Sequence, residues 1–111
     1  MIIHKALAGG RWLELSLVEQ MANIGCDIDR AIRWKNKADL ENSTKAFERA
    51  LELLYFTIAD KKNRRQLREL CRVKYAVADY FVGENSFGFT DESLHRYFFN
   101  FNYMAALRRG C

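Results

Sequence analysis

The stretch LELSLVEQMANIGCDIDRA, residues 13–31, decides the fold of this chain. Its apolar residues recur at spacings of four, four, three, four and three, at Leu13, Leu17, Met21, Ile24, Ile28 and Ala31. Spacings of three and four place side chains on one face of an α-helix. Residues 11–36 are therefore predicted to form one long amphipathic helix.

Three further segments carry the same periodicity. After Asp39, whose side chain suits a helix N-cap, a second apolar face runs from Phe47 to Ile58. A third helix is predicted over residues 63–82, and a fourth begins at Thr90 and ends at Gly110. We therefore expect an all-α fold, a small up-and-down four-helix bundle with a long first helix. The sequence leaves open an exchange of the fourth helix between subunits.

Length and composition favour one domain without long interruptions. The chain has 111 residues and no proline, so nothing need break its helices. Residues 1–10 end in a Gly-Gly pair and are predicted to be a flexible N-terminal segment, with residues 11–111 forming a single helical-bundle domain.

The same features indicate a compartment. The N-terminal stretch lacks the build of a signal peptide, and no apolar run approaches the roughly 20 residues that span a bilayer. Three cysteines without a CxxC pair argue against a disulfide framework and a zinc site. We expect a soluble cytoplasmic protein with reduced thiols and no membrane association.

The segment ADLENSTKAFERALEL, residues 38–53, resembles the second helix of a tetratricopeptide repeat. Phe47, Ala50 and Leu51 fall at the packing positions of that helix. The resemblance implies one helical hairpin. Because no second copy follows and such arrays need about three repeats, a peptide-binding groove is not implied.

Two helices show apolar residues on a second side. The fourth helix buries one face through Leu94, Tyr97, Phe98, Phe101, Met104 and Ala105. Its opposite stripe holds Phe99, Tyr103, Ala106 and Leu107, and the first helix has a similar stripe at Leu15, Val18, Ala22 and Cys26. Large exposed apolar patches usually mark interfaces, so these eight residues are predicted to form one, either in a homo-oligomer or with a partner protein. The alternative is that they pack beneath the N-terminal segment and the Phe87/Phe89 loop.

Positive charge is concentrated on the third helix. Lys and Arg total 18 against 14 Asp and Glu, and residues 61–74 contain seven of the cations with Glu69 as the single acid. At about 100° per residue, five of them share one side, which we call the basic ridge: Lys61, Arg64, Arg65, Arg68 and Arg72. Such a ridge can follow a phosphate backbone of RNA or DNA, with Tyr75 stacking on a base. It can equally be a solvated face partly neutralised by carboxylates such as Asp79.

Catalytic patterns are missing from the sequence. His4 and His95 lack partners at the spacing of a metal site or a nucleophile and base. HEPN-type ribonucleases place an arginine a few residues before a histidine, whereas residues 89–94, ahead of His95, contain none. We expect no enzyme activity, no cofactor and no metal.

Two functions follow as hypotheses. The first is a non-catalytic helical-bundle protein that acts as a self-assembling interaction or adaptor module through the two apolar stripes. The second is an accessory nucleic-acid-binding protein that uses the basic ridge to bind the phosphate backbone without sequence specificity.

Overall fold

The computed structural model describes residues 10–108, with side chains as far as Phe101. Its helices are α1 (Trp12–Glu14), α2 (Leu17–Asn36), α3 (Leu40–Ala59), the 3₁₀ helix η2 (Lys61–Gln66), α4 (Leu67–Val82) and α5 (Asp91–Arg108). No strand occurs within residues 10–108, so the all-α class is confirmed. Most of the predicted flexible segment, residues 1–9, lies outside the described part.

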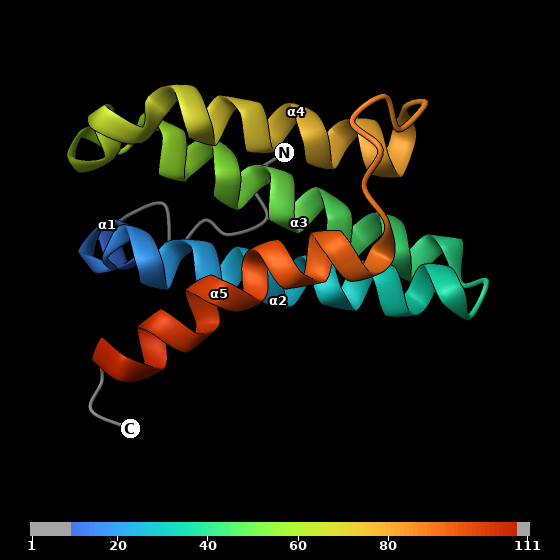
Figure 1. The fold of residues 1–111 in the computed structure, drawn as a ribbon. Coiled ribbons are helices and arrows are strands. Elements are labelled where there is room, and N and C mark those ends of the chain that lie inside the picture. The colour runs from blue at the N-terminus through green and yellow to red at the C-terminus, as the bar shows by residue number, and fades with distance from the viewer. Residues whose placement is uncertain (1–9, 109–111) are drawn as a thin grey trace.

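Helices α2 and α3 form an antiparallel hairpin that carries the other two long helices (Figure 1). Helix α4 packs on α3, and α5 crosses α2 obliquely. The hairpin turn depends on Ala38, whose φ is +61°, and on Asp39, whose side chain accepts a hydrogen bond from the Asn42 N–H at 3.1 Å. Asp39 is therefore the N-cap of α3, as predicted.

The first helix is broken, contrary to the expectation of one helix over residues 11–36. Ser16 takes an extended conformation, and its hydroxyl accepts from the Glu19 N–H at 3.2 Å while the Glu19 carboxylate accepts from the Ser16 N–H at 3.1 Å. This capping box starts a new helix at Leu17. Leu13 consequently leaves the predicted apolar face and is 51% exposed, whereas Trp12 enters the core.

The core lies where α2 meets α3 and α5. Its most deeply buried aliphatic side chains come from all four long helices: Ile24, Ile28, Leu54, Val77 and Leu94. Helix α5 packs closely on α2 at Gly25, where an added Cβ would lie 2.7 Å from the Cβ of Phe98. A glycine at this position lets the buried Phe98 ring seat against the backbone of α2.

The third predicted helix begins as a 3₁₀ segment and becomes α-helical only at Leu67. Asp60 caps this segment, its carboxylate accepting from the Lys62 N–H at 3.2 Å. The fourth predicted helix starts as expected, since the Thr90 hydroxyl accepts from the Ser93 N–H at 3.0 Å.

Candidate functional site

A buried polar network fixes the basic segment to the rest of the molecule. Asn63 is only 2% exposed, and its side-chain amide donates to the Gln20 side-chain oxygen at 2.8 Å and to the Thr57 carbonyl at 2.9 Å. The Gln20 amide in turn donates to the Trp12 carbonyl and to the Asp60 carboxylate, both at 3.0 Å. Because these hydrogen bonds join Asn63 to residues of other elements, the network holds η2 in one orientation.

Asp60 stays ionised within this network. Burial by itself raises the pKa of its carboxyl, but hydrogen bonds from Lys62 and Gln20, together with the Lys62 charge, outweigh burial and lower the pKa. The Lys62 ammonium contacts Asp60 and also donates to the Leu13 carbonyl at 3.0 Å. The Lys62 ammonium is therefore held by contacts within the molecule and does not contribute a free charge.

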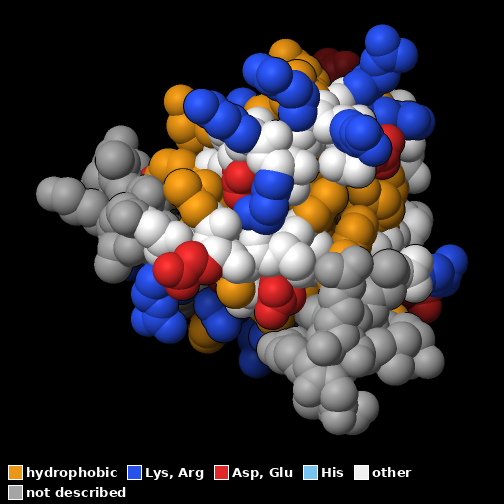
Figure 2. All heavy atoms as spheres, turned by 90° about the vertical axis from the view of Figure 1, so that its left-hand side faces the viewer, with side chains coloured by type: hydrophobic (Ala, Val, Ile, Leu, Met, Phe, Trp, Pro, Cys, Tyr) orange, Lys and Arg blue, Asp and Glu red, His pale blue; other side chains and the backbone are white. Residues whose placement is uncertain are grey.

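The basic ridge is exposed to solvent. Its members all have exposed side chains, and among the described residues none of them makes an ion pair or a side-chain hydrogen bond: Lys61, Arg64, Arg65, Arg68 and Arg72. Figure 2, which views the left-hand end of Figure 1, shows Lys and Arg side chains gathered on this face. Asp79, the carboxylate expected to neutralise the ridge, instead accepts from the Phe87 N–H at 3.1 Å.

The geometry of the ridge differs from the single α-helical stripe that was predicted. In the 3₁₀ part, residues three apart share a face, which groups Lys61 with Arg64. In α4, Arg68 and Arg72 are four apart and also share a face. The predicted stacking residue, Tyr75, lies one turn after Arg72 and is 70% exposed. The ridge thus consists of two adjoining parts with an exposed aromatic ring at one end.

The predicted interface residues are only partly available. Val18 and Ala22 are buried against Phe101, so α5 covers the second apolar side of α2 within the monomer. Leu15 is half-buried against the core, and only Cys26 of this stripe is exposed. Val18 and Ala22, which were predicted to lie in an interface, are therefore covered within the monomer by Phe101 of α5.

The stripe on α5 is represented by one described side chain. Phe99 is 52% exposed, and its ring lies 5.7 Å from that of His95. His95 itself contacts the Asp29 carboxylate at 2.8 Å, a partner on α2 that helical spacing could not reveal. The side chains of Tyr103, Ala106 and Leu107 lie outside the described part.

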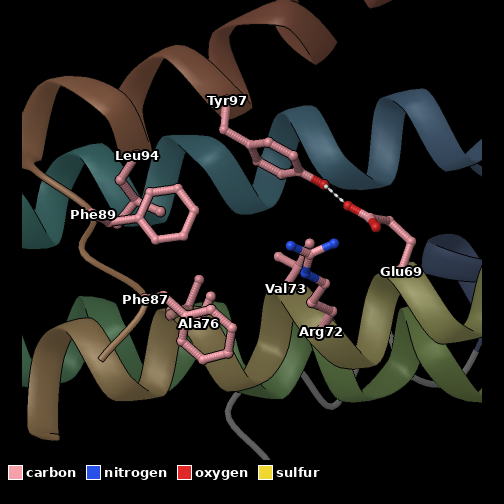
Figure 3. Close-up of a pocket in the computed structure, with 9 residues that line it drawn as sticks. Glu69, Arg72, Val73, Ala76, Phe87, Phe89, Leu94 and Tyr97 are labelled. Carbon is pink, nitrogen blue, oxygen red and sulfur yellow. Dashed lines mark hydrogen bonds between the residues drawn. The ribbon is translucent and has the colours of Figure 1, made fainter. Parts of the chain in front are cut away.

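A cavity of about 260 Å³ lies between α4 and α5, beside the ridge (Figure 3). Its apolar wall is formed by Val73, Ala76 and Val77 of α4 and by Leu94 of α5. Sequence reasoning missed this cavity because its walls come from segments far apart in the chain. The one signal in the sequence was the pair of apolar rings, Phe87 and Phe89, in the loop between the last two helices, and both rings line the cavity.

The polar end of the cavity is formed by Glu69, Arg72 and Tyr97. The Tyr97 hydroxyl donates to Glu69 across the cavity at 3.3 Å. Burial, followed by the charge of Glu69 and this hydrogen bond, raises the pKa of Tyr97 to about 12, against an opposing influence from Arg72. Tyr97 is therefore a neutral hydrogen-bond donor near neutral pH.

The described part of the molecule contains neither a metal-binding cluster nor a membrane-spanning helix. Among the described side chains, no three His, Cys, Asp or Glu residues cluster closely enough to hold a metal ion. No helix within residues 10–108 combines the length and apolar character needed to cross a membrane.

Comparison of the chain with protein-family models, with curated protein sequences and with solved structures gives no match.

Proposed function

We propose that this protein is a non-catalytic, accessory nucleic-acid-binding protein that grips the phosphate backbone with its basic ridge and does not read sequence. The proposal takes the four long helices as an up-and-down bundle that serves as the rigid support. One observation carries it: the ridge cations are exposed and have no carboxylate partner among the described residues.

The exposed, unpaired arginines of the ridge are well suited to binding phosphate. Each guanidinium presents a planar fork of donors that matches phosphate oxygens. Clustered like charges repel one another, and a polyanion relieves that repulsion while releasing its condensed counterions. The buried contacts of Asn63 hold η2 in place, so the cations of the ridge are positioned before binding. Tyr75 adds a ring on which a base of any identity can stack.

The test is fluorescence anisotropy of labelled single-stranded RNA and duplex DNA across a salt series. Neutralising about four or five phosphates predicts a log–log slope of about −4 on duplex DNA and a shallower slope on single strands. The triple variant Arg64→Gln, Arg65→Gln and Arg68→Gln should lose most of this affinity. Arg72 is retained in this variant because it also lines the cavity.

A matched control separates the ridge from net charge. Arg33, Lys37 and Arg49 are exposed cations on α2, at its C-cap and on α3, so changing all three to Gln removes the same charge from elsewhere. The proposal requires this control to retain most of its affinity. Equal losses in the two triple variants, or no binding of either nucleic acid at low salt, would refute it.

We also propose self-association through the exposed face of α5, supported by the half-exposed ring of Phe99. Sedimentation analysis of the wild type should give a mass above the monomer, and Phe99→Asp should give a folded monomer. Tyr55→Asp is the control, since Tyr55 is an exposed ring on α3. A wild type that stays monomeric at high concentration would end this second proposal.

A further inference from the structure

The cavity between α4 and α5 has the form of a small-molecule site. Its volume of about 260 Å³ lies below the range of about 300–1,000 Å³ usual for drug-sized ligands, which points to a small metabolite. The walls are apolar along Val73, Val77 and Leu94, and the polar groups gather at one end (Figure 3). A ligand that fits this division has an apolar body and a polar head.

The polar end carries two opposite charges. Glu69 and Arg72 are three residues apart on α4, so both side chains project from the same face of the helix. They form no ion pair with each other, and among the described residues Arg72 has no hydrogen-bond partner. Glu69 accepts from Tyr97 through one carboxylate oxygen, which leaves the other oxygen free of described partners.

The aromatic end is held by the loop between α4 and α5. Asn85 clamps Phe89, since its side-chain oxygen accepts from the Phe89 N–H at 3.0 Å and its amide donates to the Phe89 carbonyl at 2.7 Å. The Phe87 N–H donates a hydrogen bond to the Asp79 carboxylate at 3.1 Å. Because these hydrogen bonds lie entirely within the chain, they hold the apolar part of the cavity in place, which lowers the cost of binding.

We propose that this cavity binds a free α-amino acid with an apolar side chain. The carboxylate of the ligand accepts from the Arg72 guanidinium, and its ammonium group donates to Glu69. The side chain lies between the helices against Val73, Leu94 and the phenyl rings of the loop. A simple carboxylic acid would meet repulsion from Glu69, and a simple amine would meet repulsion from Arg72, so a zwitterion is the head group that satisfies both charges.

The experiment is calorimetry of the full chain with L-phenylalanine and L-leucine. Three probes remove one feature at a time: 3-phenylpropanoate lacks the ammonium group, 2-phenylethylamine lacks the carboxylate, and glycine lacks the side chain. We expect saturable binding of at least one of the two amino acids and at least about ten-fold weaker binding of each probe, because each leaves a charged or apolar group of the site unmatched.

Variants assign the contacts. Arg72→Gln and Glu69→Gln should each weaken binding by about ten-fold or more, whereas Arg68→Gln, on the neighbouring ridge, should leave it unchanged. All three side chains are exposed, so the fold should survive, and circular dichroism of each variant checks this. The measurement is independent of nucleic acid, so its outcome does not depend on the function of the ridge.

Three results would overturn the proposal. The first is no saturable binding of either amino acid at millimolar concentration. The second is equal binding of 3-phenylpropanoate and L-phenylalanine, which would show that the ammonium group is not recognised. The third is equal loss of affinity in Arg68→Gln and Arg72→Gln. That result would show that the overall positive charge of the ridge, and not a contact with Arg72, attracts the ligand.

Discussion

Gly25→Ala should destabilise the protein, although the same change usually strengthens a helix. In an ordinary helix interior, alanine is favoured over glycine by about 1 kcal/mol. At Gly25 the new Cβ would lie 2.7 Å from the Cβ of Phe98, whereas unstrained carbon atoms approach to about 3.5–4.0 Å. A Cβ atom moves only with its backbone, so α5 as a whole must shift by about 1 Å relative to α2.

The size of the effect follows from these opposing contributions. Overpacking a close contact typically costs about 1–3 kcal/mol, and the upper part of this range, about 2–3 kcal/mol, applies here because a helix backbone has to move. The gain in helix propensity offsets about 1 kcal/mol of this cost. We expect Gly25→Ala to lower the free energy of unfolding by about 1–2 kcal/mol, or the melting temperature by about 5–10 °C for a domain of this size. Urea denaturation followed by circular dichroism measures the difference directly.

The neighbouring position supplies the control. Cys26 is exposed on the same helix, so Cys26→Ala should be more stable than Cys26→Gly by about 1 kcal/mol, which reports propensity alone. If the alanine variant is less stable than the glycine form at position 25 but more stable at position 26, the α2–α5 contact decides the result. If Gly25→Ala is as stable as the wild type or more so, the close approach of Phe98 does not constrain α5.

Three smaller predictions concern caps and titrating groups. Ser16→Ala removes the acceptor for the Glu19 N–H and should cost about 1 kcal/mol in urea denaturation, while unchanged stability would mean that the break before α2 does not depend on this cap. The Asp60 carboxylate stabilises the fold above its unfolded pKa of about 4, and this effect is lost as the pH falls through its lowered folded pKa. The difference in stability between the wild type and Asp60→Asn should therefore narrow in acid. A difference that does not change with pH would contradict this. The Tyr97 phenol has an unfolded pKa of about 10 and a folded pKa of about 12, so its contribution is complete below about pH 10 and is lost as the pH rises through about 12. Tyr97→Phe should flatten the alkaline loss of stability measured over that range, and an identical alkaline profile would argue against the burial of this hydroxyl.

The apolar periodicity predicted the long helices because a helix face is a local property. Met21, Ile24, Ile28 and Ala31 are all buried, as their spacing indicates. The same periodicity could not show which neighbour covers each face. The stripe at Val18 reads as an exposed surface in the sequence, yet the partner that buries it, Phe101, is far along the chain.

Helix caps are local signals, so the sequence contains them. Asp39 and Thr90 were identified as caps, whereas Ser16 with Glu19 three residues later is the same kind of signal and was missed. The 3₁₀ segment was not predictable in this way. Asn63 is held by Gln20, which lies 43 positions away, and a polar residue between cations gives no sign of burial.

The candidate sites differ in how far the sequence could define them. The charge and exposure of the basic ridge follow from composition and helical position, and both agree with the structure. The cavity depends on the distance between α4 and α5 in the folded chain, which helical periodicity does not give. Glu69 and Tyr97 are 28 positions apart, so only the folded chain shows that they face each other.

The attachment of α5 to α2 has a consequence for the order of synthesis. The contacts that secure α5 join residues 56 and 66 positions apart, Lys35 with Asp91 and Asp29 with His95. A growing chain presents α2 long before α5 exists, so the apolar side of α2 at Val18 and Ala22 stays uncovered while the intervening helices are made. During that interval the nascent chain exposes an apolar surface that the finished protein buries.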